Sequence, residues 1–232
     1  MALVASQLGD RFAHPLAVSN VAKATNPAAT PVPAVAYLFK YTLTAPTAAS
    51  TTKYLSTGVA GPNATTKTVL VSAFDGTYST GIPDFPRNAV VTVTHATAVV
   101  ANSGTITGTD RYGKALTEAW SVTAATTSKT FTGKKSFATI TQITITAATD
   151  ASANTVKLGT GAVFGLPYTC PNVNIIGEMT DAAIGTAGTI VAASSASTAD
   201  PRGTYAPNAA PDASKTYVLY FICDDPTTST TV

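Results

Sequence analysis

Short segments rich in Val, Ile, Thr and aromatic residues follow one another from residue 36 onward, and Gly, Pro, Asn or Ser bounds each of them. Such segments are typical of β-strands separated by turns. Residues that favour helices are scarce: Glu118 and Glu178 are the only Glu residues, and most Asp residues stand beside Gly, Pro or Thr, as in turns. The sequence therefore predicts an all-β chain. The predicted strands include residues 37–43, 68–74, 88–94, 154–158, 162–166, 188–192 and 216–223.

The most legible element is a β-hairpin predicted over residues 104–122. Asp110 and Gly113 occupy the first and last places of a four-residue turn, which type I turns favour for these residues. On the return strand Glu118 and Trp120 share a face. A carboxylate beside Trp is unusual in a core, so we expect this face to be half covered. We expect the strands to form an antiparallel β-sandwich, immunoglobulin-like or jelly-roll-like.

Another predicted strand contains Ile140 and has an irregular apolar pattern. Phe137, Ile143 and Ile145 occupy odd positions, whereas Ile140 occupies an even one. A regular strand with one buried face cannot bury all four side chains. We therefore expect either a bulge near Thr141 or a strand that is covered on both faces.

The chain divides into a short first part and one large domain. Residues 1–35 contain four prolines among small residues, which disfavours both helix and central strand. This part is either an extended N-terminal arm or an unstructured tail. Residues 36–225 form the predicted β-sandwich domain, and residues 226–232 form an exposed tail. The candidate anchors of the arm are Leu8, Phe12 and Leu16.

The last third of the chain combines long loops with one very apolar strand. Residues 177–213 are dominated by Ala, Ser, Thr, Asp and Pro, and we expect surface loops around a strand at 188–192. Residues 216–223 are apolar at both odd and even positions. Such a strand lies either in a sheet covered on both sides or with one face against a partner.

Charge and hydropathy exclude several classes of protein. The 14 Lys and Arg residues against 12 Asp and Glu residues give a net charge of +2 with no basic cluster, which disfavours nucleic-acid binding. No apolar run approaches the length of a membrane span, and the first residues lack the pattern of a signal peptide. We therefore expect a protein made in the cytoplasm. Only 11% of residues are charged, which suits a protein that acts outside the cell after lysis.

No catalytic or metal-binding pattern is present in the sequence. His14 and His95 are the only histidines, and neither accompanies a nucleophile motif. Glu118 and Glu178 lack the context of a glycosidase pair, and no calcium-loop motif occurs. We expect no enzyme activity, no cofactor and no metal, although a hydrolase on a β-sandwich remains a third hypothesis.

Two residue types leave alternatives open. Cys170 and Cys223 are the only cysteines, and their apolar neighbours favour buried free thiols over a bridge. Tyrosine is enriched at protein interfaces as well as in cores, so the Tyr residues of the first and last predicted strands serve either subunit contacts or sandwich packing. These candidates are Tyr37, Tyr41, Tyr217 and Tyr220.

Turn and strand motifs follow one another in a distinctive order between residues 82 and 225. They are Asp84-Phe-Pro-Arg-Asn-Ala-Val-Val-Thr-Val, Gly104-Thr-Ile-Thr-Gly-Thr-Asp-Arg-Tyr-Gly, Leu116-Thr-Glu, Phe137-Ala-Thr-Ile-Thr, Leu158-Gly-Thr-Gly, Gly165-Leu-Pro and Arg202-Gly-Thr-Tyr-Ala-Pro-Asn, followed by the last apolar strand. This order resembles that of head decoration, or cement, proteins of tailed bacteriophages. The resemblance implies a β-sandwich that binds the outer surface of the virion capsid, commonly as a homotrimer. Its partner would be the major capsid protein, and its role capsid stabilisation.

A second hypothesis is a phage tail, fibre or baseplate β-module that binds a host surface glycan. Such a module would carry aromatic residues in its long loops, and residues 177–213 contain only Tyr205. The sequence therefore favours a structural virion protein with no nucleic-acid or membrane partner.

Overall fold

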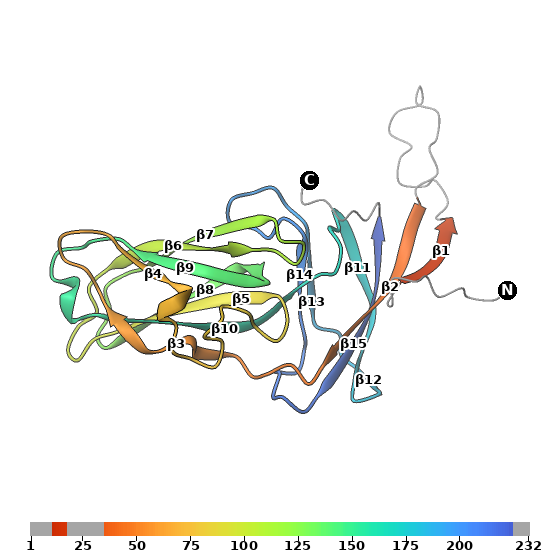
Figure 1. Cartoon of the computed structure of the whole chain (residues 1–232). Helices are drawn as coiled ribbons and strands as arrows, with labels where there is room; N and C mark the ends of the chain where they lie inside the picture. The colour runs from red at the N-terminus through yellow and green to blue at the C-terminus, as the bar shows by residue number, and fades with distance from the viewer. Residues whose placement is uncertain (1–10, 18–34, 225–232) are drawn as a thin grey trace, which may run out of the picture.

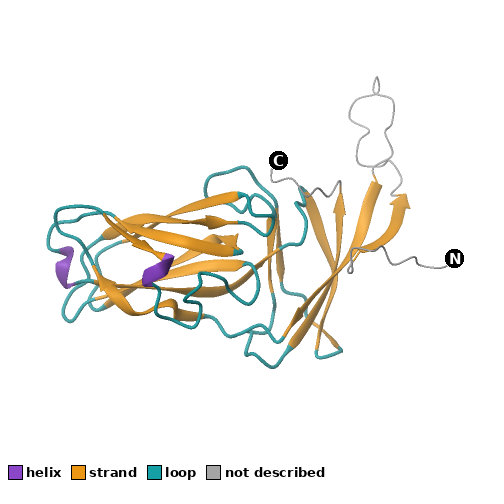
Figure 2. Ribbon diagram, in the orientation of Figure 1, coloured by secondary structure: helices purple, strands orange, loops and turns teal. Residues whose placement is uncertain are grey.

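The computed structural model describes residues 11–17 and 35–224 of the chain. Across these residues the strands form three antiparallel sheets, and the helical elements described are two single 3-10 turns, η1 (Val71–Ala73) and η2 (Ala151–Ala153). Figure 2 shows how completely strands and loops make up the molecule. The predicted all-β, antiparallel class is confirmed.

Turns and loops separate the strands, as the turn residues between the β-branched segments predict, and a long connection joins β4 to β5. They are β1 (Arg11–Ala17), β2 (Val35–Thr44), β3 (Ser50–Ala60), β4 (Lys67–Leu70), β5 (Arg87–Thr94), β6 (Asn102–Thr109), β7 (Ala115–Val122), β8 (Ser128–Phe137), β9 (Thr139–Ile145), β10 (Thr155–Gly165), β11 (Asn172–Thr180), β12 (Ala183–Gly185), β13 (Thr189–Ala192), β14 (Gly203–Ala206) and β15 (Thr216–Asp224).

Two of the sheets face each other and form a sandwich (Figure 1). One has the order β4-β9-β6-β7, and the other has the order β13-β14-β10-β5-β8, with β3 also paired to β10. Alternating side chains from both sheets meet in a first core, where the single Trp120 is buried and its Nε1 donates to the carbonyl of Thr144 at 3.2 Å. Other large members of the first core are Tyr54, Leu55, Val91, Ile106, Phe137, Ile143 and Leu158.

The third sheet, which we call the end sheet, has the order β1-β2-β15-β11-β12 and stands at one end of the sandwich (Figure 1). Its inner face packs on the second core, to which the sandwich contributes Phe164 of β10 and Tyr205 of β14. Because Val156 and Leu158 of β10 belong to the first core, β10 runs through both cores. The range predicted as one sandwich domain, 36–225, thus contains two hydrophobic cores joined by one strand. The rest of the second core includes Phe39, Leu43, Leu166, Cys170, Leu219, Phe221 and Cys223.

The predicted N-terminal arm contributes the first strand of the end sheet. β1 pairs antiparallel with β2, with an irregular register between Phe12 and Pro15. The remaining residues of the predicted arm before β2 lie outside the described residues, as does the predicted tail.

Two local predictions are confirmed in detail. The backbone N–H of Gly113 donates to the carbonyl of Asp110 at 3.0 Å and Gly113 has φ of 78°, which closes the turn between β6 and β7. In the pairing of β6 with β9 the register shifts between Thr107 and Gly108, whose partners are Gln142 and Ile140. Thr141 is therefore the extra residue of the expected bulge.

Three predictions about strands are wrong. The expected short pair at 154–158 and 162–166 is one continuous strand, β10, because backbone and side chains pack where the Cβ atoms of Gly159 and Gly161 would lie. The expected loop region 177–213 contains the predicted strand at 188–192 as β13, but it also carries the end of β11, β12 and β14, and β14 pairs with both β10 and β13. The end of the segment predicted as a strand at 68–74 forms the turn η1.

Candidate functional site

One face of the end sheet is lined by apolar side chains that the chain does not fully cover. β15 lies between β2 and β11, and its odd-numbered side chains, such as Leu219, are buried in the second core. The intervening side chains Val218, Tyr220 and Ile222 point to the opposite side and are partly exposed. The last apolar strand therefore has one face in the core and one face directed outward.

Neighbouring strands extend this apolar surface. Residues directly opposite one another in antiparallel strands share a face, and Ile222 stands opposite Leu38, Tyr220 opposite Lys40, and Val218 opposite Met179. Ile184 of β12 stands opposite Met179 and is 87% exposed. We call the resulting surface the outer face. It consists of Leu38, Lys40, Met179, Ile184, Val218, Tyr220 and Ile222.

The layer arrangement explains why the outer face is open. Strands β13 and β14 of the sandwich lie on the inner side of the end sheet (Figure 1), and β11 contacts β13 there. Among the described strands, none packs as a further layer on the other side. An apolar sheet face without a covering layer is a candidate surface for association.

The structure separates the predicted contact residues into distinct groups. Tyr41 and Tyr217 point inward and are buried, and the hydroxyl of Tyr217 donates to the carbonyl of Ala210 at 2.9 Å. Tyr220 lies on the outer face, and Tyr37 lies beside Phe39 at the edge of the second core with a ring-centroid distance of 6.5 Å. The burial of Tyr41 and Tyr217 leaves Tyr220 and Tyr37 as the accessible tyrosines of the predicted set.

The three predicted anchors of the arm have different outcomes. The backbones of Phe12 and Leu16 pair with Leu38 and Ala36 in β1 and β2. Leu8 lies outside the described residues. Sequence reasoning missed Leu38, Met179 and Ile184 as members of the outer face, because only strand pairing brings β2, β11 and β12 into one sheet with β15. The signal that could have found Ile222 and Val218 is the apolar residue at every position of the last strand.

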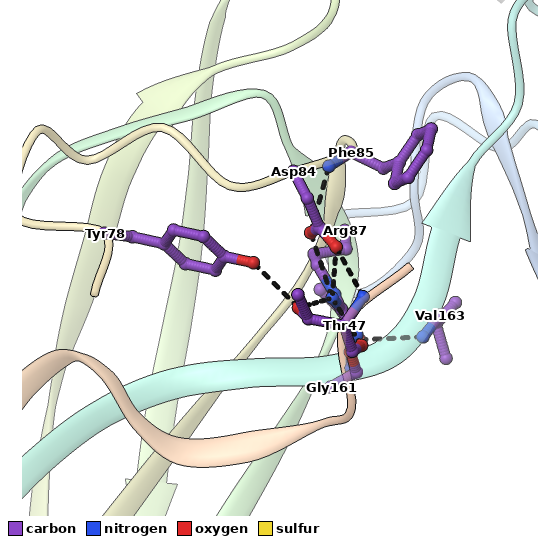
Figure 3. A network of polar contacts seen from close by, with 8 residues as sticks. Thr47, Tyr78, Asp84, Phe85, Arg87, Gly161 and Val163 are labelled. Atoms are coloured by element: carbon purple, nitrogen blue, oxygen red, sulfur yellow. Dashed lines mark hydrogen bonds and ion pairs between the residues drawn. The ribbon is translucent and has the colours of Figure 1, made fainter. Parts of the chain in front are cut away.

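Buried Arg87 of β5 binds both β10 and the connection that leads from β2 of the end sheet to β3 of the sandwich (Figure 3). Arg87 is 0% exposed, and its Nε donates to the carbonyl of Gly161 at 2.8 Å while its NH1 donates to Asp84 Oδ1 at 3.0 Å. NH1 also donates to the carbonyl of Thr47 at 3.0 Å, and the guanidinium stacks on Phe164 at 4.8 Å from the ring centroid. Every part of the guanidinium thus has a partner, so the group acts as a structural clasp.

Asp84 is held ionised by the same clasp. Burial would raise the pKa of Asp84, but the backbone N–H of Thr47, at 2.7 Å, and the charge of Arg87 outweigh it and lower the pKa below its usual value. Thr47 also bonds the hydroxyl of Tyr78 at 2.8 Å, which connects the clasp to the first core (Figure 3). The cluster therefore fixes the β2–β3 connection.

A second polar cluster ties the tip of the β6–β7 hairpin to the start of β14. The guanidinium of Arg202 lies 4.2 Å from the ring centroid of Tyr112 and 3.7 Å from Asp110, and its NH2 donates to the carbonyl of Pro167 at 3.0 Å. Asp200 accepts the backbone N–H groups of Ser136, Arg202 and Gly203. Burial raises the pKa of Asp200 in spite of these bonds. The side chains of Arg202 and Asp200 therefore interact with other groups of the fold.

A shallow cavity of about 500 Å³ opens where the edge strands β7 and β8 meet. Glu118 is one of its lining residues, and Glu118 Oε1 accepts the backbone N–H groups of Lys134 and Lys135 at 2.6 and 3.2 Å. Burial raises the pKa of Glu118. The hydroxyl-rich lining, with one aromatic ring and two ammonium groups, suits a small polar ligand. The lining residues are Thr105, Thr117, Glu118, Ala119, Phe131, Thr132, Lys134, Lys135, Ser197 and Thr198.

The remaining candidate chemical groups have structural partners. His95 Nδ1 accepts the backbone N–H groups of Thr97 and Ala98, at 2.9 and 3.0 Å, and so closes a turn. Glu178 accepts the backbone N–H groups of Gly188 and Asn208. In the described ranges no group of three or more His, Cys, Asp or Glu residues could hold a metal ion. Nor does any helix of that part have the length and apolar character to cross a membrane.

A comparison of the chain with known protein families, with curated proteins and with solved structures found no match.

Proposed function

We propose that this chain is a structural virion protein that binds the outer surface of a tailed-phage capsid and stabilises the shell. The observation that carries the proposal is the outer face: an apolar sheet surface with Tyr220 at its centre and without a covering layer among the described strands. Aromatic and aliphatic side chains of this kind form the buried centres of protein interfaces. The order of turn and strand motifs, which resembles that of head decoration proteins, supports the same class.

The proposed partners are the major capsid protein and other copies of this chain, with a homotrimer as the assembly. Many copies on a regular shell gain strength from modest individual contacts, so a small apolar surface on each copy is sufficient. The proposal assigns the chain no catalytic role, no cofactor, and neither a nucleic-acid nor a membrane partner. Its location is the outer capsid surface, after synthesis in the host cytoplasm.

The test is binding to expanded capsids that lack the protein. The parent chain should bind such capsids in a sedimentation assay and raise the temperature at which they break. Tyr220→Asp places a charge on the outer face and should weaken binding at least tenfold, since a buried unpaired charge is costly. Thr65→Glu adds a charge in the exposed β3–β4 connection and serves as the matched control. Equal binding by all three proteins would refute the role of the outer face.

Two further measurements separate the parts of the proposal. Sedimentation velocity of the parent chain and of Tyr220→Asp shows whether the same face joins copies of the chain. Deletion of residues 1–34 removes β1 from the edge of the end sheet and should weaken capsid binding while the two cores remain folded. If the parent chain fails to bind any expanded capsid, the proposed function is wrong.

The cavity at the β7–β8 junction favours a second candidate, a glycan-binding module of a phage tail, fibre or baseplate. Tyr205, the one aromatic residue predicted to be in a long loop, is buried in the second core, so Phe131 is the ring available for stacking on a sugar. A bacterial glycan microarray probed with the parent chain and with Phe131→Ala tests this candidate. This candidate is supported if the parent chain and Thr65→Glu bind a glycan that Phe131→Ala does not bind. It is wrong if the parent chain binds no glycan.

A further inference from the structure

The two cysteines of the chain lie together in the second core. Cys170 precedes β11, Cys223 lies near the end of β15, and both side chains are 0% exposed. β11 and β15 are neighbours, and Val173, three residues after Cys170, stands opposite Cys223 in their pairing. Strand pairing therefore brings two residues that are distant in sequence to the same place.

The two thiols contact each other and the backbone around Cys170 is fixed. The Cys170 thiol is hydrogen-bonded to that of Cys223. The backbone N–H of Cys170 donates to the carbonyl of Arg202 at 3.1 Å, and its carbonyl accepts the N–H of Ala193 at 2.8 Å. Two thiols held in contact by the fold need little further movement to form a bond.

We propose that Cys170 and Cys223 are an oxidative modification site at which a hydroperoxide forms an intramolecular disulfide. In the first step one thiol reacts with hydrogen peroxide to give a sulfenic acid and water. In the second step the sulfur of the other thiol attacks the sulfenic sulfur, the S–S bond forms, and a second water leaves. The two thiols lose two electrons and two protons in total, and the peroxide is reduced to water.

The environment makes this reaction slow in the folded state. The hydrogen bond that the Cys170 thiol donates to Cys223 and the burial of Cys170 both raise the pKa of the Cys170 thiol, so the reactive thiolate is scarce at neutral pH. A bulky thiol reagent has no access to either sulfur, whereas peroxide is small enough to enter during brief local openings. We therefore expect a protein that is isolated reduced and is oxidised over hours.

The disulfide would add a covalent link between two parts of the fold that are already joined by packing and by the hydrogen bonds of Glu178. Cys223 belongs to the end sheet, while Cys170 is hydrogen-bonded to the segments that flank β13 and β14 of the sandwich. The new bond would close a long loop of the chain. A disulfide of this kind typically raises the melting temperature of a domain of this size by about 5–15 °C.

The experiment treats the full, reduced chain with hydrogen peroxide and then removes the oxidant. Before treatment, an aromatic disulfide reagent should detect about two thiols in guanidinium and almost none in the native protein. After treatment the thiols should be lost, the mass should fall by about 2 Da, and a non-reduced digest should contain the peptides of Cys170 and Cys223 joined. Reduction should restore both thiols and the original melting temperature.

Cys170→Ser is the matched control, because it keeps a small polar side chain and leaves Cys223 alone. This variant should gain oxygen at Cys223 or remain unchanged, with no intramolecular cross-link. The peptide map of the parent chain keeps the test valid if the variant folds poorly. The proposal is wrong if the parent chain gains sulfinic acid without a cross-link, joins into disulfide-linked dimers, or keeps both thiols.

Discussion

Arg87 is a charged side chain that is fully buried in the fold. A buried guanidinium is stable here because the carbonyl of Gly161, the carboxylate of Asp84 and the ring of Phe164 surround it. In the sequence the segment that begins at Asp84 resembles an ordinary turn before a strand. Asp84 is a local partner, but Gly161 and Phe164 lie far along the chain, so local pattern could not predict the clasp.

Replacing Arg87 with Met should lower the free energy of unfolding by about 3–5 kcal/mol, because the buried carbonyl of Gly161 and the carboxylate of Asp84 lose their donor. Arg87→Lys should cost less, since it keeps the charge but loses the planar fork. Urea unfolding followed by circular dichroism measures both values. A loss below about 1 kcal/mol for Arg87→Met would contradict the structural role of the clasp.

Asp75 should give the fold part of its sensitivity to acid. Hydrogen bonds from the Thr57 hydroxyl and the Ser56 backbone N–H lower the pKa of Asp75 to about 2. A carboxylate whose pKa is lower in the folded state stabilises the fold above its unfolded pKa, and this stabilisation is lost as pH falls from about 4 to 2. Asp75 is exposed, so the contribution is below about 1 kcal/mol.

The corresponding measurement is the melting temperature of the parent chain and of Asp75→Asn between pH 2 and 6. We expect the parent chain to lose more stability than the variant between pH 4 and pH 2, and the two curves to run parallel above pH 5. Parallel curves over the whole range would show that the Asp75 bonds contribute nothing.

At the scale of strands, the two glutamates show how separate sheets are joined. Glu118 of β7 accepts backbone N–H groups of β8, and Glu178 of β11 accepts N–H groups near β13 and after β14. Inward-pointing charged residues also protect strand edges against unwanted pairing. The expectation that the Glu118 face is half covered is wrong, since Glu118 and Trp120 are both buried. Composition shows that Glu is rare, but it does not show that each of the two Glu side chains joins two sheets.

Variants of Glu118 should separate its hydrogen bonds from its charge. Because burial raises the pKa of Glu118, ionisation destabilises the fold progressively as pH rises above about 4.5. Glu118→Gln keeps an acceptor without the charge, so its stability relative to the parent should rise with pH. Glu118→Ala should lose about 1–3 kcal/mol at every pH, because two buried N–H groups lose their acceptor. Urea unfolding of the parent chain and of both variants at pH 4 and pH 8 measures these differences in the free energy of unfolding.

Strand positions could be predicted well where β-branched residues alternate between clear turns, as in β5 and in the β6–β7 hairpin. They were missed where tertiary pairing overrides local preference. β10 continues through Gly159 and Gly161 because the neighbouring backbone and the side chain of Asn88 need the space of a Cβ. β14 forms within residues 200–208, where Pro and Asn favour a loop, because the side chain of Tyr205 is buried in the second core.

For the whole molecule, the two cores should unfold together because β10 supplies residues to both. Trp120, the only tryptophan, reports on the first core, and the reactivity of Cys170 and Cys223 reports on the second. We expect tryptophan fluorescence and thiol labelling of the reduced chain to give the same midpoint in guanidinium. Thiols that become reactive well below the fluorescence midpoint would show that the end sheet opens independently.

The path of β10 also determines how the molecule responds to force. Between Thr155 and Thr160 this strand is hydrogen-bonded to β5 on one side and to β3 on the other. A pull that draws the end sheet away from the sandwich acts along β10, so these bonds are loaded together in shear and do not open one after another. Unfolding under tension then requires the hydrogen bonds of β10 to β3 and β5 to break at the same time. A protein anchored through its end sheet would therefore unfold in a single step and only at high force.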